Sequence, residues 1–309
     1  MAKLSLMLMC YNTAHLLGRT LETLKNQGLD DWELIIIDDM SEDDVPAAIA
    51  NHGDGLPIVY QKLVHDIGMR GNTASINHGI SISTGELVMW STPEVMLSPL
   101  TLRAVHDKLS GNATPTFITI PSHGLTYEVQ IELDNLDWQT NIHAIKDYVN
   151  TYPDEDFIIR WFYLNFYEHG DRSTLHRETY GNNQTVAVNK SMWLDKIGYF
   201  PLFYDYGSDD PWVAGERRKQ GYTDVTLWDY EAYHQWHPKA QHWMAQGKAP
   251  NWNALGHTMR NIANDPRIPD GGTCAIWDGG SHAQLSAQQV ADELTWVERV
   301  KQTGFTARE

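Results

Sequence analysis

Two pairs of aspartates have types and positions suited to binding or proton transfer. Asp38 and Asp39 follow the apolar run 32–37, and carboxylates at the end of a strand accept hydrogen bonds from base N–H or ribose hydroxyl groups. Asp209 and Asp210 open an expected helix, where one of them can act as a general base if the pair faces a cleft. Helix capping is the alternative role for both pairs. In the second pair, a cap explains one aspartate well and the other less well.

A glutamate and two histidines are candidate metal ligands. Glu94 lies in the loop after the apolar run 86–90, and His234 and His237 follow a later expected strand, 225–228. Carboxylate and imidazole groups bind divalent metals. Two histidines without a third ligand nearby are also typical of surface or packed histidines, and the residues alone favour that interpretation.

The elements that must position these residues alternate between strand and helix. Short apolar runs of this kind are typical of strands buried on both faces. Short links between them predict a mostly parallel sheet covered by helices on both faces, with ligands bound beyond the carboxyl ends of its strands. The expected strands are 4–10, 32–37, 56–61, 86–90 and 115–121, and the expected helices are 16–24, 43–50, 70–83 and 99–109.

The pattern weakens between residues 122 and 182, which indicates an insertion or lid, and resumes with a strand at 184–188. Helices are expected at 190–197 and 208–220, before the strand 225–228. The remaining residues are polar with helical stretches, of which 287–303 is the clearest.

Composition excludes several classes of protein. The chain has 309 residues, and 23 basic against 40 acidic side chains give a net charge of 23 − 40 = −17, which disfavours non-specific binding of nucleic acid. Two cysteines are too few for a disulfide framework or a multi-cysteine zinc site. No apolar run reaches the length of a membrane span, so we expect a soluble, cytoplasmic protein. The absence of a P-loop, of a G-x-G-x-x-G turn and of a nucleophile elbow argues against nucleotide triphosphatases, Rossmann dehydrogenases and α/β hydrolases.

Several motifs in this order resemble the family-2 glycosyltransferases of the GT-A fold. The most specific stretch is residues 4–44, LSLMLMCYNTAHLLGRTLETLKNQGLDDWELIIIDDMSEDD. Gly68, the run 77–80 (NHGI) and the run 84–86 (TGE) are similar to the segment that leads into the family's central strand. Further matches are 197–200 (IGYF), Asp209 with Asp210, and Gly221; His234 and His237 lie where many members carry a metal-binding histidine.

The resemblance implies a nucleotide-sugar donor, in particular a UDP-sugar. Asp39 would bind the uracil base, with Asp38, Tyr11 and Asn12 close by. On the same basis, Arg70 would contact the phosphates and Asn77 belongs to the donor-binding set. Asp210, with Asp209 beside it, aligns with the family's catalytic base.

One departure concerns the metal. The family's Asp-x-Asp motif falls at residues 91–93, where the sequence reads Ser-Thr-Pro, and only Glu94 follows as a carboxylate. Members associated with phages and viruses carry a similar Pro-Glu-Val loop, which implies Glu94, His234 and His237 as the ligands of Mn²⁺ or Mg²⁺. Oxygens of the donor diphosphate would have to complete this small set of ligands.

The expected architecture is therefore an α/β protein with a GT-A, Rossmann-like sheet. The catalytic domain would span 1–240, with a nucleotide-binding half at 1–121, the lid at 122–182 and an acceptor half at 183–240, followed by a helical extension at 241–309. The expected function is sugar transfer to a glycan or other hydroxyl acceptor with inversion, and Asp210 as general base. The alternatives are a phage-type enzyme that glycosylates a hydroxylated DNA base, which the net charge disfavours, and a nucleotide-sugar binding protein without catalysis.

Overall fold

A computed structural model provides the structure of the protein. It describes residues 3–63, 73–125, 127–139, 141–142, 144–145, 185–198, 213, 216–236, 276–277 and 282–283. The predictions for Arg70, Asp209, Asp210, His237, most of the 122–182 segment and the helix at 287–303 concern residues outside these ranges.

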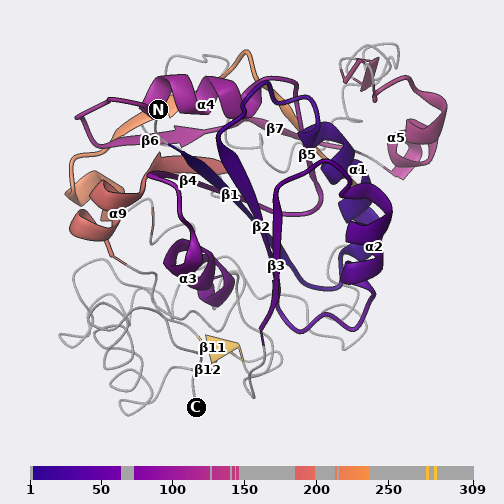
Figure 1. Ribbon diagram of the computed structural model, residues 1–309, viewed down its shortest axis with the longest axis horizontal. Helices are drawn as coiled ribbons and strands as arrows, with labels where there is room; N and C mark the ends of the chain where they lie inside the picture. The colour runs from indigo at the N-terminus through magenta and orange to yellow at the C-terminus, as the bar shows by residue number, and fades with distance from the viewer. Residues whose placement is uncertain are drawn as a thin grey trace.

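The core of the molecule is a seven-stranded sheet in the order β3-β2-β1-β4-β8-β6-β9 (Figure 1). The four strands β3, β2, β1 and β4 run parallel, β8 is antiparallel to β4 and to β6, and β9 is parallel to β6. The strands are β1 (Leu4–Cys10), β2 (Trp32–Asp38), β3 (Ile58–Lys62), β4 (Leu87–Ser91), β6 (Thr116–Thr119), β8 (Val186–Asn189) and β9 (Thr223–Thr226). This mostly parallel sheet confirms the predicted fold class.

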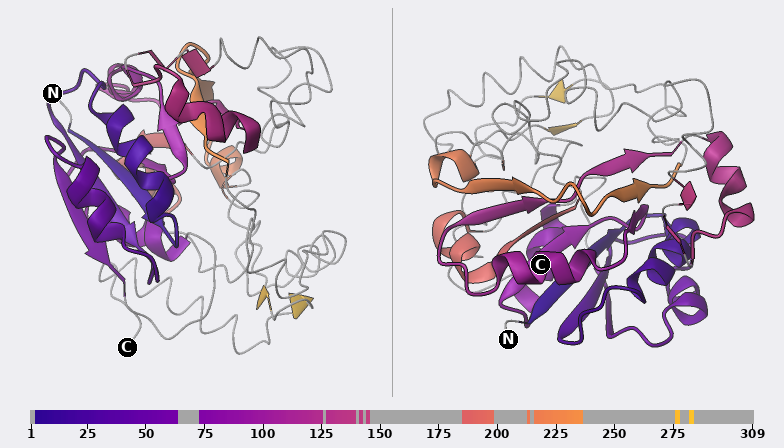
Figure 2. Two further views of the ribbon diagram at one scale, coloured as in Figure 1. Left: turned by 90° about the vertical axis from the view of Figure 1, so that its right-hand side faces the viewer. Right: turned by 90° about the horizontal axis from the view of Figure 1, so that it is seen from above.

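Helices connect the parallel strands and cover both faces of the sheet (Figures 1 and 2). They are α1 (Ala14–Leu24), α2 (Val45–His52), α3 (Thr73–Ile82), α4 (Thr101–Leu109) and α9 (Lys190–Lys196). The helices expected at 16–24, 43–50, 70–83, 99–109 and 190–197 thus begin within three residues of their predicted starts. None of the helices in the described part of the chain is long and apolar enough to cross a membrane.

The alternation of side chains along β1 explains the two apolar layers. Leu6 and Leu8 belong to the main core with Leu17 and Leu21 of α1. Met7 points to the other face, where α3 approaches so closely that a Cβ at Gly79 would lie 2.5 Å from the Met7 sulfur. Glycine at position 79 therefore allows α3 to pack against the sheet.

Aromatic side chains fill the core around β4, β6 and α9. Trp90 packs edge-to-face on Trp193, with ring centroids 5.4 Å apart, and Phe117 lies 6.3 Å from both. The guanidinium carbon of the buried Arg217 lies 4.4 Å from the centre of the Phe117 ring. Burial and the charge of Asp195 raise the pKa of Tyr222, at the edge of this cluster, to about 12.

A second, three-stranded sheet has the order β5-β10-β7. Its strands are β5 (Val95–Leu97), β10 (Ala232–His234) and β7 (Ser122–Gly124), and β10 is antiparallel to β5 and parallel to β7. After β7, the helix α5 (Tyr127–Glu132) and the 3-10 helix η1 (Leu133–Asn135) follow. Apolar side chains of α5 and η1 pack with Met96 and Tyr233 in a small second core. The start of the 122–182 segment thus pairs with β10 and packs against side chains of β5 and β10.

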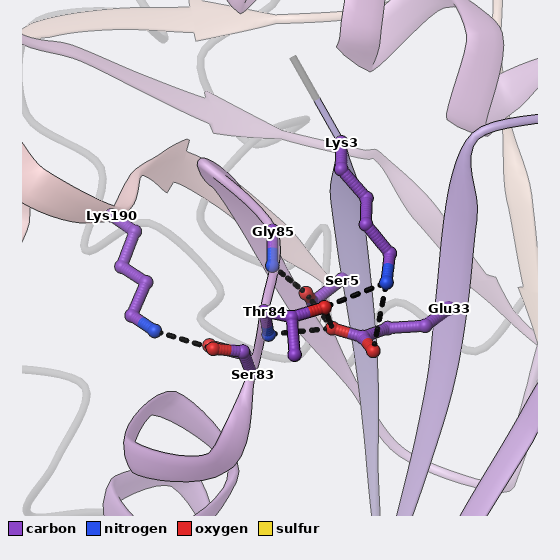
Figure 3. Close-up of polar contacts among 7 residues, drawn as sticks. All are labelled: Lys3, Ser5, Glu33, Ser83, Thr84, Gly85 and Lys190. Carbon is purple, nitrogen blue, oxygen red and sulfur yellow. Dashed lines mark hydrogen bonds and ion pairs between the residues drawn. The ribbon is translucent and has the colours of Figure 1, made fainter.

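A buried carboxylate ties three strands together at the amino edge of the main sheet (Figure 3). Glu33 accepts hydrogen bonds from the Ser5 hydroxyl (2.6 Å), from the Thr84 amide and hydroxyl (2.7 and 2.8 Å) and from the Lys3 ammonium (3.2 Å). Burial by itself raises the pKa of this carboxyl, but the hydrogen bonds outweigh it and lower the pKa from 4.5 to about 2. A Cβ at Gly85 would lie 2.6 Å from the Ser5 hydroxyl oxygen, so the run 84–86 serves the packing of this edge.

Replacing Asp44 with alanine is expected to cost about 1 kcal/mol of stability. The Asp44 carboxylate accepts a hydrogen bond from the Ala47 amide at 2.9 Å and caps the amino end of α2, and alanine leaves that amide without its partner. Urea unfolding of D44A measures the loss. The exposed Asp30 caps no helix, so D30A should stay within about 0.5 kcal/mol of the parent, and an equal loss in both variants would contradict the cap.

In the 241–309 region, the described residues are two short antiparallel strands, β11 (Ile276–Trp277) and β12 (His282–Ala283).

Candidate functional site

The carboxyl ends of β1, β2 and β3 lie in one row at the edge of the main sheet. Cys10 pairs in register with Asp38, and Asp38 pairs with Lys62. The chain leaves β1, β2 and β4 at this edge, because these strands are parallel. The candidate residues that follow the strands are therefore brought to the same side of the molecule, as the sequence predicts.

Asp38 serves the structure of this edge. Its side chain is fully buried, and its carboxylate accepts hydrogen bonds from the Ser41 amide and the Tyr60 hydroxyl, both at 2.7 Å. The Lys62 ammonium lies 3.5 Å from the same carboxylate and donates to the Ser41 carbonyl at 2.8 Å. Burial and the Asp38 carboxylate raise the pKa of Tyr60. With these partners, Asp38 holds the turn that presents the next residue, Asp39.

The loops after β1 and β2 are joined by reciprocal hydrogen bonds. The Asn12 amide donates to the Ser41 hydroxyl at 3.0 Å, and the Glu42 amide donates to the Asn12 side-chain oxygen at 2.7 Å. Asn12 has a φ of 54°, in the left-handed region that asparagine tolerates better than most residues. Asn12 thus shapes the site as a bridge between two loops.

Asp39 and Tyr11 are the accessible pair of this edge. The Asp39 amide donates to the Cys10 carbonyl at 2.8 Å, and its side chain is half-buried. Tyr11 is 42% exposed, and partial burial together with the charges of Glu42 and Asp39 raises the pKa of its hydroxyl. A carboxylate beside an exposed aromatic ring can accept hydrogen bonds from a base whose face stacks on the ring.

Glu94 and His234 are brought together across a long stretch of sequence. The Glu94 carboxylate lies 3.8 Å from His234 Nε2, and the two side chains are 13% and 14% exposed. Burial, followed by the charges of Glu94, Asp38 and Asp43, raises the pKa of the Cys10 thiol. β4 is parallel to β1, with Ser91 opposite Leu8, so Glu94 follows β4 at the same carboxyl edge as the loops of Tyr11 and Asp39.

This pair fits part of the coordination shell of a divalent cation. A carboxylate oxygen and an imidazole nitrogen bonded at about 2.1 Å to one metal ion lie about 3.0–3.4 Å apart at octahedral or tetrahedral angles, so the observed 3.8 Å requires a small movement of the side chains toward each other. The described residues contain no group of three or more His, Cys, Asp or Glu side chains able to hold a metal. Further ligands would have to come from elsewhere, and ions such as Mg²⁺ commonly use water and substrate phosphates.

The other candidate residues divide into two groups. Asn77 is fully buried on α3, and its place in the donor-binding set stays a prediction. Arg70, Asp209, Asp210 and His237 lie outside the described residues, and their roles stay predictions.

The structure adds Lys62 to the site, which sequence reasoning missed. Its ammonium group is a cation at the carboxyl edge, 46% exposed and held by Asp38 and Ser41. The available signal was its position: Lys62 directly follows the run 56–61 that was interpreted as a strand, in the same way that Asp38 follows the strand before it.

The comparisons with known proteins agree with this architecture. The sequence model of the family described as "Glycosyl transferase family 2" matches residues 5–178, more than half of the chain. No curated protein sequence matches the chain.

Solved structures share the fold at low sequence identity. The mannosyltransferase PcManGT from Pyrobaculum calidifontis, in complex with GDP-Man and Mn²⁺, has a TM-score of 0.55 at 16% identity over 87% of this chain. TarS 1-349 of S. aureus, in complex with UDP-GlcNAc, has a TM-score of 0.51 at 15% identity over 85% of this chain. The alignments cover 66% and 67% of those two chains and 40% of a longer TarS structure.

Proposed function

The chain belongs to glycosyl transferase family 2, and we propose that it transfers a sugar from a nucleoside-diphosphate donor to an acceptor hydroxyl. One observation carries the proposal. The Asp39 and Tyr11 loops and the Glu94–His234 pair follow the parallel strands at their carboxyl edge, the edge at which such sheets bind ligands.

The base of the donor would lie against the loops after β1 and β2. Asp39 would accept a hydrogen bond from a base N–H, and the Tyr11 ring would pack against the base. The buried Asp38 would fix the backbone that presents Asp39. The two solved structures named above hold nucleotide sugars, one with guanine and one with uracil, and we propose UDP as the nucleotide here.

The diphosphate would lie between the base site and the Glu94–His234 pair. These two residues, with His237, would hold Mn²⁺ or Mg²⁺, which offsets the negative charge of the leaving diphosphate. We propose that Lys62 and Arg70 also offset the negative charge of the diphosphate.

Transfer would proceed with inversion. Asp210 removes the proton of the acceptor hydroxyl, whose oxygen forms a bond to the anomeric carbon from one side. The bond from the anomeric carbon to the phosphate oxygen breaks on the opposite side, and the nucleoside diphosphate leaves with the electron pair. We place Asp209 beside this base, at the start of the same expected helix. The net charge of −17 favours a glycan or other hydroxyl compound over a nucleic acid as acceptor.

A thermal-shift screen tests the donor assignment directly. UDP and GDP are added to the protein with and without Mn²⁺, and a ligand at 100 times its dissociation constant stabilises by about 2.7 kcal/mol. A shift with UDP that increases with Mn²⁺ supports the proposal. A shift with GDP alone would correct the nucleotide, and no shift with either would overturn the function. Nucleotide binding without transfer from any donor would favour a binding protein.

Replacing Asp39 with alanine is expected to weaken UDP binding by about 10- to 100-fold, because a hydrogen bond to a charged group contributes about 1.5–3 kcal/mol. Isothermal titration calorimetry measures the affinity. Asp31 lies at the opposite end of β2 and is exposed, so D31A removes the same charge without touching the site. Equal affinities for D39A and D31A would show that Asp39 does not contact the nucleotide.

A further inference from the structure

We propose that Gln235 and Thr20 form a brace that positions Glu94 and His234 for a divalent cation. The inference rests on the proposed function and adds two positioning residues to it. Neither residue is charged, and neither is among the candidate site residues predicted from the sequence.

Gln235 connects the pair to helix α1. Its backbone amide donates to the Glu94 carbonyl at 2.7 Å. Its side-chain amide donates to the Leu16 carbonyl at 3.0 Å and to the Thr20 hydroxyl at 3.3 Å. Gln235 directly follows His234 and is fully buried, so one residue holds the backbone of Glu94, the strand end that carries His234, and the helix.

Thr20 closes the brace from the helix side. Its hydroxyl donates to the Pro93 carbonyl at 2.5 Å while it accepts from Gln235. Thr20 of α1 therefore holds the Pro93 carbonyl, and Gln235 holds the Glu94 carbonyl. The backbone is therefore held on both sides of the Cα that bears the Glu94 side chain.

The rigid support behind the brace is helix α1. Leu17 and Leu21 of this helix are fully buried in the main core, and α1 lies along the sheet in Figure 1. The strand β10 is also held by β5 and β7, where His234 pairs with Val95 and Gly124. Those contacts fix the backbone of His234, and the brace adds side-chain hydrogen bonds from α1 to Pro93 and to Gln235.

The chemistry of the brace requires a donor at position 235 and a hydroxyl at position 20. Both partners of the Gln235 NH₂ group can accept, and a carboxylate in its place would face the Leu16 carbonyl. A hydroxyl that accepts from Gln235 and donates to Pro93 is available only to serine or threonine in this space. Groups that orient metal ligands in this way typically change metal affinity by about 10- to 100-fold when they are removed.

The test uses two threonines of the same helix. Thr20→Val keeps the shape and removes the hydroxyl, and Thr20→Ser keeps the hydroxyl. Thr23→Val is the matched control, because Thr23 is also buried and its hydroxyl bonds the Thr20 carbonyl and the Leu97 amide instead of the 93–94 loop. Gln235→Leu removes the other half of the brace.

Two measurements compare these variants with the parent protein. Electron paramagnetic resonance of free Mn²⁺ gives Mn²⁺ affinity, with and without UDP, and hydrogen–deuterium exchange follows the amide of Gln235. We expect T20V and Q235L to bind Mn²⁺ about 10-fold more weakly and to exchange this amide faster than T23V. T20S should restore both properties.

The outcomes separate the inference from the function on which it rests. Equal Mn²⁺ affinity and equal exchange in T20V and T23V would overturn the brace, while UDP binding by the parent protein would leave the function standing. UDP binding that never involves Mn²⁺ would overturn the cation role in the same way. If the parent protein bound Mn²⁺ but no nucleotide, the function would fail, and the contrast between T20V and T23V in Mn²⁺ affinity would still support the brace.

Discussion

Replacing Asp210 with asparagine is expected to lower the rate of sugar transfer by about 10²- to 10⁴-fold, the usual contribution of a positioned general base. Asparagine has nearly the same shape as aspartate and cannot accept the proton of the acceptor hydroxyl at neutral pH. The affinity for UDP should stay within about two-fold, since the proposed site places the base against the loops after β1 and β2, away from Asp210. Single-turnover assays with the donor identified by the screen measure the rate, and calorimetry measures the affinity.

The contrast between the two properties is what identifies a base. A loss of UDP affinity equal to the loss of rate would show that Asp210 binds the donor. Unchanged turnover would remove it from the mechanism. Asp209→Asn is the informative neighbour: if Asp209 supports the base and does not act as one, its substitution should reduce the rate by less than D210N.

Replacing Glu33 with glutamine is expected to destabilise the protein by about 3 kcal/mol at pH 6 and by about 1 kcal/mol at pH 3. The pKa of Glu33 is lowered from 4.5 in the unfolded chain to about 2 in the folded protein, and each unit is equivalent to about 1.4 kcal/mol. Because the folded pKa is the lower one, this stabilisation is complete above pH 4.5 and is lost as the pH falls toward 2. Urea unfolding at the two pH values measures it.

A nearby glutamate provides the control for this pH dependence. Glu86 lies close to the same edge and is exposed, so E86Q should reduce the free energy of unfolding by no more than about 0.5 kcal/mol at either pH. A difference between E33Q and the parent that does not shrink at pH 3 would show that glutamine disturbs packing and that the charge of Glu33 contributes little.

The main sheet could be predicted because its signals are local. The run 4–10 and the observed strand β1 coincide, and the run 32–37 ends one residue before β2 does. Each is a mostly apolar segment, and these two strands, which are consecutive in the chain, pair with each other. The order of the polar residues after these strands therefore indicated which side chains would share an edge.

The second sheet and the brace could not be predicted for the opposite reason. The strands β5, β7 and β10 have three residues each, too few for a period of two to be recognised. Gln235 and Thr20 are 215 positions apart, and nothing in either residue type indicates the contact. Glu33 was interpreted only as part of a buried strand, because its four hydrogen bonds come from segments distant in sequence.

The position of Glu33 relative to Asp39 has a consequence for how this protein can change over evolution. Both residues belong to β2 or to its end, but Glu33 lies at the amino edge of the sheet and Asp39 at the carboxyl edge. The stabilisation by Glu33 that depends on pH acts at one edge, and the proposed nucleotide site lies at the other. Substitutions near Asp39 that change nucleotide preference therefore need not alter the contacts of Glu33. Nucleotide preference and stability toward acid can then change independently during evolution, although both depend on the same strand.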